Sequence, residues 1–225
     1  MRKFDENYSL IRVFHAVPGG DTVDIYINDR LFYKGLSFTQ FTPYIYVPKG
    51  KYTLIVYGED TIDNPILSQE VEVNNDELIT MVLTGDADDI RLLPVIEDKD
   101  LADGNNSKLR FVHLVPNGLP VDIIIDNVTQ FTDVKFRDIT EYIVVAPKEY
   151  IIDIVVSQNN QTVGRDKVNV KPNRIYTFYA IGYAPNFDVI QSVDGGTFLI
   201  WSIKGYNKFV IAFYINLNAY EHLKF

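Results

Sequence analysis

The sequence contains no cysteine, only two methionines, one tryptophan and few alanines, and each shortage excludes something. Without cysteine, the chain has no disulfide framework, no thiolate-bound zinc or iron–sulfur cluster and no thiol nucleophile. It has no run of 18 apolar residues, so the sequence predicts no membrane span. Only 8 alanines stand against 25 isoleucines and 24 valines. Because β-branched side chains favour strands and alanine favours helices, this balance predicts an all-β protein.

Acidic residues outnumber basic ones, and they are unevenly distributed along the chain. The 225 residues carry a formal net charge of −9. Residues 1–98 hold 8 basic and 17 acidic side chains, whereas residues 196–225 hold 3 and 1. An acidic protein repels phosphate groups, so we expect no nucleic-acid partner. The sequence becomes acidic soon after Met1 without a 7–15-residue apolar stretch, and we therefore predict no secretory signal peptide.

An internal repeat is the most informative pattern. The segment 11–29 aligns without a gap to 109–127 at an offset of 98, with nine of nineteen positions identical. The same offset pairs Tyr44 with Tyr142, and the alignment continues with one gap to the end of each copy. Chance does not keep two segments in register over such a length, so the chain is predicted to contain two homologous domains.

The repeat divides the chain into four parts. We expect a first domain over residues 1–98, a linker over 99–107, a second domain over 108–195 and a tail over 196–225. The linker is polar and rich in turn-forming residues, which predicts an exposed connection.

Within each repeat, the pattern predicts short strands at close spacing. Apolar and polar residues alternate over 23–27, which is typical of a strand with one buried face. Turn residues at 48–50, 74–76 and 171–173 predict hairpins between the flanking strands. About seven strands in each repeat would form a two-sheet sandwich, so the predicted fold is two tandem antiparallel β-sandwich domains.

Two sequence blocks occur in both copies and point to a family. The first reads R-[VF]-x-H-x-V-P at 12–18 and 110–116, and the second reads V-D-I-x-I-[DN] at 23–28 and 121–126. In tandem, these blocks resemble the bacterial domain-of-unknown-function 4397 family. The resemblance implies an immunoglobulin- or prealbumin-like sandwich, often exported or associated with the cell envelope, and it brings no catalytic residues with it.

His15 and His113 are the sharpest candidate site residues, because they occupy the same position in the two repeats. Asp24 and Asp122 also share a position. Histidine titrates near neutral pH and needs an orienting partner to act as a base, so a His–Asp pair is one interpretation. The alternative is structural: His15 alternates with apolar neighbours, and a half-buried imidazole can simply bond to a nearby loop.

Tyrosines form a second candidate site. We predict a binding face made by Tyr26, Tyr44 and Tyr46, since exposed aromatic side chains are common where sandwich domains hold sugars or proteins. The alternative for these tyrosines is packing in the core or between the domains.

Other chemistry finds little support in the sequence. No Gly-x-Ser-x-Gly elbow or phosphate-binding glycine loop is present. Three carboxylates gather at 86–89, but the second repeat does not keep them, which favours a solvated loop over a metal site. The residues from Asp98 fit the calcium-loop spacing poorly. We therefore predict no catalytic residue, metal or cofactor.

The tail over 196–225 matches neither repeat and holds eight aromatic residues. Alternating apolar residues from Phe209 to Leu217 predict a strand. Four interpretations are open: an edge strand on the second repeat, the start of a third repeat, an interfacial membrane anchor, or a segment foreign to the family. An unpaired apolar strand aggregates, so we favour packing or self-association.

Together these observations favour a non-catalytic binding, adhesion or structural protein, with a protein or carbohydrate partner, at the cell envelope or spore surface. The alternatives are an intracellular structural or partner-binding protein and, third, a metal-dependent enzyme whose site the sequence does not reveal.

Overall fold

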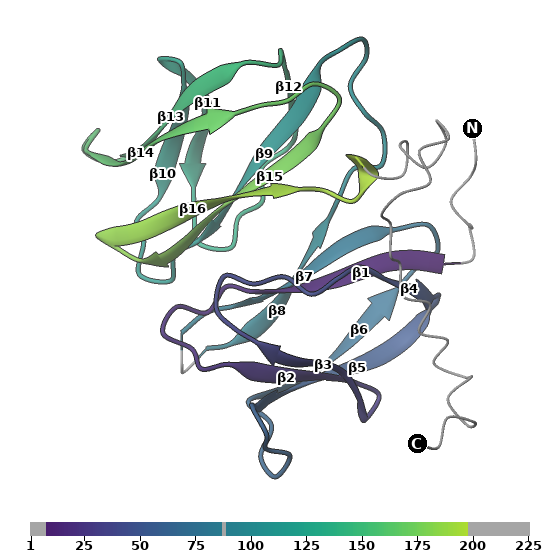
Figure 1. Cartoon of the computed structure of the whole chain (residues 1–225). Coiled ribbons are helices and arrows are strands. Elements are labelled where there is room, and N and C mark those ends of the chain that lie inside the picture. Colours follow the sequence, from purple (N-terminus) through teal and green to yellow (C-terminus); the bar gives the residue numbers. More distant parts are fainter. Residues whose placement is uncertain (1–7, 87–88, 198–225) are drawn as a thin grey trace.

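Strands form nearly all of the regular secondary structure in the part of the chain that the structure describes. The structure is a computed structural model that describes residues 8–86 and 89–197. These residues form sixteen strands in two units, β1–β8 and β9–β16 (Figure 1). The all-β prediction and the tandem arrangement are therefore confirmed, with eight strands in each repeat rather than about seven.

The first repeat contains β1 (Tyr8–His15), β2 (Val23–Ile27), β3 (Arg30–Leu36), β4 (Ile45–Pro48), β5 (Gly50–Gly58), β6 (Leu67–Val73), β7 (Leu78–Thr84) and β8 (Arg91–Ile96). The second contains β9 (Ser107–Leu114), β10 (Val121–Ile125), β11 (Val128–Val134), β12 (Ile143–Val145), β13 (Glu149–Val156), β14 (Thr162–Asn169), β15 (Ile175–Tyr183) and β16 (Asn186–Val193).

Each repeat is built from two four-stranded sheets with equivalent strand orders. We call β4-β1-β7-β8 and β12-β9-β15-β16 the inner sheets, because they face each other where the repeats meet. The outer sheets are β3-β2-β5-β6 and β11-β10-β13-β14. Strand pairing is antiparallel throughout, with two exceptions: β1 pairs parallel with β7, and β9 with β15. The result is a stack of four sheets, outer–inner–inner–outer (Figure 1).

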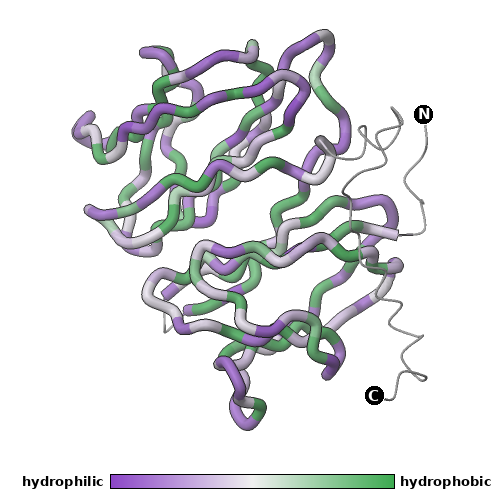
Figure 2. Tube along the Cα trace, viewed as in Figure 1, coloured by the Kyte–Doolittle hydropathy of each residue, from purple (hydrophilic) through white to green (hydrophobic). Residues whose placement is uncertain are grey.

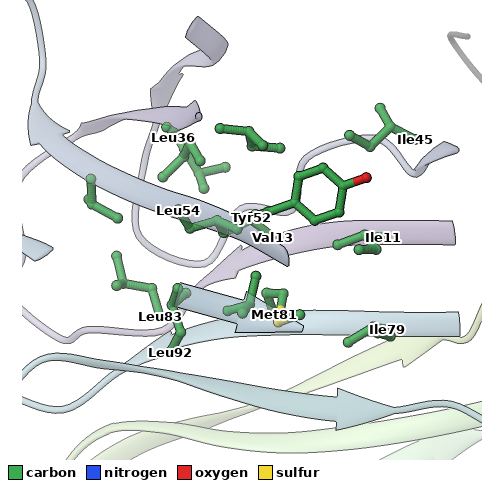
Figure 3. Close-up of a cluster of buried hydrophobic side chains, with 14 of the residues drawn as sticks. Ile11, Val13, Leu36, Ile45, Tyr52, Leu54, Ile79, Met81, Leu83 and Leu92 are labelled. Carbon is green, nitrogen blue, oxygen red and sulfur yellow. The ribbon is translucent and has the colours of Figure 1, made fainter. Parts of the chain in front are cut away.

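A separate apolar core fills each sandwich. In the first repeat, residues that alternate along β1, β5 and β7 point between the sheets, as Figure 3 shows for Val13, Leu54 and Met81. The second repeat repeats this arrangement with Phe111 and Ile152. Figure 2 shows the same alternation of hydrophobic and hydrophilic residues along the strands. Burial of these alternate side chains fixes the register, because a shift by one residue would expose them all.

A third apolar cluster joins the two repeats. Buried residues from both inner sheets meet in it, among them Phe14 and Val82 of the first repeat and Val112 and Tyr179 of the second. The ring centroids of Phe14 and Tyr179 are 5.0 Å apart. The central strands of the inner sheets are buried on both faces, as the burial of all seven residues of β7 shows.

The hairpins expected at 48–50, 74–76 and 171–173 are not formed, which corrects the sequence analysis. At each of these turns the chain crosses from one sheet of the sandwich to the other. It passes from the inner sheet (β4) to the outer (β5) at the first turn, and from the outer sheet (β6, β14) to the inner (β7, β15) at the other two. A turn sequence fixes a local change of direction, but which strand pairs with which depends on distant residues.

The tightest hairpins lie elsewhere. Asn28 and Asp29 join β2 to β3, and Asp126 and Asn127 join β10 to β11, all four with positive φ. Two-residue turns with two left-handed residues match the twist of paired strands, and Asn and Asp tolerate this conformation.

The linker is only partly exposed, contrary to the expectation for it. Ala102 and Ser107 are buried, whereas Asp103, Gly104 and Asn105 are exposed. The tail beyond residue 197, with its predicted strand, lies outside the described residues. Within residues 8–86 and 89–197, no helix is long and apolar enough to cross a membrane.

Candidate functional site

The two histidines close equivalent loops. Val17 donates its backbone N–H to Nδ1 of His15 at 3.3 Å, so Nε2 carries the proton and donates to the carbonyl of Asp21 at 3.0 Å. His113 makes the same bonds to Val115 and Leu119, at 3.2 Å each. Both imidazoles are buried, and burial lowers the pKa of each below 6.5. Both ring nitrogens are thus used by the loop that follows the strand.

A glycine in each loop makes room for the ring. A Cβ on Gly20 would lie 3.1 Å from Cε1 of His15, and a Cβ on Gly118 only 2.7 Å from Cε1 of His113. The shared H-x-V-P-x-G pattern is therefore a loop closure in which imidazole and glycine pack together.

The aspartates bond to other loops, so the structure does not form the His–Asp pairs that were one interpretation of the sequence. Asp24 accepts the backbone N–H of Gly35 at 2.8 Å and of Asp60 at 3.1 Å. Asp122 accepts the N–H of Asp133 at 2.9 Å and the hydroxyl of Ser157 at 2.6 Å. Each carboxylate thus accepts hydrogen bonds from backbone N–H or hydroxyl groups of loops and strands next to its own strand in the outer sheet.

The three predicted tyrosines do not share a face, which corrects the sequence analysis. Tyr26 lies on β2 in the outer sheet, where its ring meets that of Tyr57 edge-on at 5.2 Å. Tyr46 lies on β4 beside Tyr8, with ring centroids 6.4 Å apart. Tyr44 precedes β4 and lies in the contact between the repeats, where its hydroxyl bonds to Glu97.

A buried polar network next to the third apolar cluster is the main feature that the sequence analysis missed. In the first repeat, Nε of Arg12 donates to Thr80 Oγ1 at 2.7 Å, and Thr80 in turn donates to Glu97. Tyr44 donates to both oxygens of Glu97, at 2.8 and 2.7 Å. We call Arg12, Thr80, Glu97 and Tyr44 the first relay.

The second repeat contains an equivalent second relay, formed by Arg110, Thr177, Asp194 and Tyr142. Arg110 donates to Thr177 at 3.0 Å, and Asp194 Oδ2 accepts from Thr177 at 2.7 Å and from Tyr142 at 2.6 Å. Each arginine also lies over the tyrosine of its relay, 4.5 Å from the Tyr44 ring and 4.4 Å from the Tyr142 ring.

The two relays differ by one methylene group. Arg12 reaches Glu97 directly at 3.2 Å, whereas Arg110 makes no ion pair with the shorter Asp194 among the described residues. Arg110 Nη2 and Asp194 Oδ1 are therefore both buried without a hydrogen-bond partner. The signal that could have revealed the relays is the aligned pair Arg12/Arg110, charged within largely apolar strands, together with the aligned acids Glu97/Asp194 directly after the last strand of each repeat.

Bonds between the repeats tie the relays together. Arg12 donates to Ser192 at 2.9 Å and lies 3.9 Å from Asp194, while Gly195 donates its N–H to Glu97 at 2.7 Å. Burial has the largest single effect and lowers the pKa of Arg12, but Glu97, Tyr44, Tyr179 and Asp194 together outweigh burial, so the pKa of Arg12 is raised. Burial, followed by the charge of Glu97, raises the pKa of Tyr44.

A further polar contact between the repeats, which we call the Arg137 clamp, joins Arg137 to Asp89. Arg137 of the second repeat donates to the Asp89 carboxylate at 2.9 Å and to its carbonyl at 2.7 Å. Arg137, with Arg91, lowers the pKa of Asp89. The relays and this clamp together join the repeats through charged groups as well as apolar ones.

Metal and small-molecule sites find little support in the described part of the chain. No group of three histidine or acidic side chains could hold a metal ion there. At the former calcium candidate, the Asp98 carboxylate is paired with Lys108 at 2.5 Å. A pocket beside β11, lined by Phe131 and Asp138, has a volume of about 260 Å³, below the roughly 300–1,000 Å³ usual for ligand pockets.

The outer sheet of the first repeat presents an apolar strip. Leu31 and Ile55 lie on either side of Tyr26 in the sheet register, and Tyr57 packs against Tyr26. Leu31 is 50% exposed, and Ile66, directly before the edge strand β6, is 44% exposed, whereas Tyr26 and Tyr57 are half-buried and Ile55 is buried. We call Tyr26, Leu31, Ile55, Tyr57 and Ile66 the tyrosine strip.

The second repeat does not have this strip. Asp153 pairs with Ile124 in the register where the first repeat pairs Ile55 with Tyr26. Asp153 forms a two-pronged ion pair with Arg165, at 2.5 and 3.0 Å. The same face of the fold therefore carries a tyrosine pair in the first repeat, and in the second repeat an ion pair beside Ile124 and the exposed Ile151.

Comparison with known families identifies the chain. The sequence pattern of the family described as "Domain of unknown function (DUF4397)" matches residues 9–118 and again residues 107–197. The chain belongs to the DUF4397 family. The double match agrees with the tandem repeat, and the structure shows two copies of the DUF4397 sandwich joined through their inner sheets.

Comparison with other proteins adds little to the DUF4397 assignment. No match was found among curated proteins. A CBM26 module of Eubacterium rectale Amy13K, in complex with maltoheptaose, has 11% identity and a TM-score of 0.29 over 83% of this chain and 99% of that chain. An α-glucan-binding streptococcal virulence factor has 12% identity and a TM-score of 0.26 over 80% and 95%. Scores this low do not establish a shared fold.

Proposed function

We propose that the chain is a non-catalytic binding protein that contacts a partner protein through the tyrosine strip. The observation that carries this proposal is the half-buried Tyr26–Tyr57 pair, with the exposed Leu31 beside Tyr26, on an outer sheet whose counterpart carries the Asp153–Arg165 ion pair. Contiguous exposed apolar residues mark protein interfaces, and tyrosine is enriched in them.

The shape and charge around the strip favour a protein over a sugar. Leu31 and Ile66 are aliphatic and half exposed, and aliphatic side chains pack against apolar protein surface. Exposed carboxylates surround the strip, among them Glu59, Glu70 and Glu72. The neighbouring cations are few, and Lys51 is paired with Glu70 at 3.0 Å. The partner surface is therefore apolar at its centre and basic at its margin.

The rest of the molecule supplies a rigid support for this surface. Two cores, the apolar cluster between the inner sheets and the paired relays hold both repeats in one arrangement. Of the site candidates named from the sequence, His15, His113, Asp24 and Asp122 each bond to a neighbouring loop.

Peptide selection tests the proposal. A displayed random peptide library is selected on the full chain, and enriched peptides are measured against Tyr26→Ser/Tyr57→Ser. We expect basic, apolar peptides whose affinity falls at least about tenfold in this variant, the scale of a lost aromatic anchor. The matched control, Ile124→Ser/Ile151→Ser, changes the equivalent face of the second repeat and should keep full affinity.

Two results would contradict the proposal. Peptides that bind both variants equally would place the contact elsewhere. A glycan array on which neutral oligosaccharides bind the full chain, and lose binding in Tyr26→Ser/Tyr57→Ser, would assign the strip to carbohydrate.

A further inference from the structure

The two acids of the relays are unequally provided with donors. Glu97 accepts from Tyr44, Thr80, Arg12 and the backbone of Gly195, so both of its oxygens are bonded. A carboxylate with several donors is stable in its charged form even when buried.

Asp194 is different. Its side chain has no exposed surface, Oδ2 accepts two hydroxyl donors, and Oδ1 has no hydrogen-bond partner. The nearest cation to Oδ1 is Arg12 Nη2, at 3.9 Å, beyond hydrogen-bond distance. A buried, half-bonded carboxylate is costly when charged and much less so when it carries a proton.

The groups around Asp194 come from both inner sheets. From the first repeat these are Arg12 on β1, Tyr44 before β4 and Glu97 after β8. From the second repeat they are Arg110 on β9, Tyr142 before β12, Thr177 and Tyr179 on β15, and Ser192 on β16. Asp194 therefore meets this environment only while the repeats are packed together.

We propose that the contact between the two repeats is proton-linked: Asp194 gains a proton when the inner sheets pack together and loses it when they separate. The free oxygen Oδ1 is the position for that proton. The contact is then a pH-sensitive connection between the two repeats, tight under mildly acidic conditions and looser under alkaline ones.

The direction follows from the surroundings. Burial, and next the charge of Glu97, raise the pKa of Asp194 to about 7, against the opposing effects of Arg110 and Arg12. When the repeats separate, water reaches Asp194 and its pKa returns towards 3.8. An acid with the higher pKa in the packed state holds its proton more tightly there. The stability that this proton adds to the contact is therefore complete below about pH 3.8, decreases as the pH rises from there, and is lost above about pH 7. From about pH 6.5 to about pH 8.5, the packing equilibrium constant should fall about fourfold.

Hydrogen exchange of one amide reports this contact. The N–H of Gly195 donates to Glu97 of the other repeat, so it exchanges when the repeats separate. Its protection factor, corrected for intrinsic exchange, should fall about fourfold over that pH range in the full chain. Amides of the β2–β5 ladder, which lie inside the first repeat, serve as the internal reference.

Two variants separate Asp194 from other acids. Asp194→Asn should remove the pH dependence of Gly195 protection. Asp153→Asn, which changes an aspartate of the same repeat on the outer sheet, should keep it. An unchanged pH dependence in Asp194→Asn, or none in the wild type, overturns the proposal. Should Asp194→Asn fail to fold, a ¹³C titration of the Asp194 carboxyl group in the wild type decides: a midpoint near 7 supports the proposal, and one below about 5 overturns it.

Discussion

Arg12 Nη2 donates a hydrogen bond to the Oγ of Ser192, 2.9 Å away and 180 residues further along the chain. This bond joins β1 of the first repeat to β16 of the second, within a group of buried charges. Arg12 also contacts Glu97 and lies between the rings of Phe41 and Tyr44, 4.5 Å from each. The contact between the repeats is thus centred on one guanidinium group.

Replacing Arg12 should cost far more stability than replacing its counterpart. Arg12→Met leaves Glu97 and Asp194 buried near each other without their shared cation, which should lower the free energy of unfolding by about 3–5 kcal/mol. Arg110→Met removes one hydrogen bond and should cost about 1–2 kcal/mol. Urea unfolding followed by circular dichroism measures both. Equal losses would contradict the unequal roles of the two arginines.

Replacing a loop glycine by alanine should destabilise the fold where the added Cβ would approach the imidazole ring closely. Gly118→Ala places a Cβ 2.7 Å from the His113 ring, which two hydrogen bonds hold in place. We expect a loss of about 1–3 kcal/mol in thermal or urea unfolding, as for other overpacked sites. Gly58→Ala is the control, because its Cβ would meet only Thr61 at 3.5 Å. Similar stability in the two variants would show that the ring moves freely.

The histidines should destabilise the fold on acidification. Burial lowers the pKa of His15 and His113 in the folded chain, so the unfolded chain takes up protons first as the pH falls. The stability that the two neutral histidines contribute to the fold is complete above pH 6.5 and decreases as the pH falls through 6.5. NMR titration of the imidazole Cε1 protons should give pKa values below 6.5 for both. A value above 6.5 would indicate an anionic partner at the ring.

The two arginines that bond to Asp89, Arg137 and Arg91, should contribute unequally to the free energy of unfolding. Arg137 comes from the second repeat, is mostly buried and bonds to both the carboxylate and the carbonyl of Asp89. Arg91 is a neighbour of Asp89 on the same repeat and is well exposed. Arg137→Ala should lower the free energy of unfolding by about 1–3 kcal/mol, and Arg91→Ala by no more than about 1 kcal/mol. Urea unfolding checks both, and a larger loss in Arg91→Ala would contradict this assignment.

Much of the fold could be predicted from the sequence because it depends on local pattern and on repetition. The alternation over Val23–Ile27 predicted a strand, and the offset of 98 predicted two copies. The sheet pairing could not be predicted in this way. The turn at Pro48–Gly50 reads as a hairpin, yet β4 pairs with β1 and β5 with β2, because burial of Ile45 and Leu54 in a common core decides the pairing.

The candidate site was harder to predict, since contacts between repeats leave little trace in one sequence. The conserved positions of His15 and His113 in the two repeats fit a shared loop closure as well as a shared reaction, and only the ring contacts distinguish the two. Tyr44 and Tyr26 have similar surroundings in the sequence. The structure places Tyr44 on Glu97 and leaves Tyr26 on an outer sheet.

The contact between the inner sheets has a consequence for how such chains arise. Equivalent positions of both copies enter it, as Phe14 and Val112, Val82 and Tyr179, and Arg12 and Arg110 show. Use of the same patch on both sides is the mark of a symmetric dimer. A one-repeat ancestor that associated with itself would already have made this joint, and fusion of two gene copies would only have tethered it. Afterwards the halves could diverge, and the shortening of Glu97 to Asp194 would be one trace of that freedom.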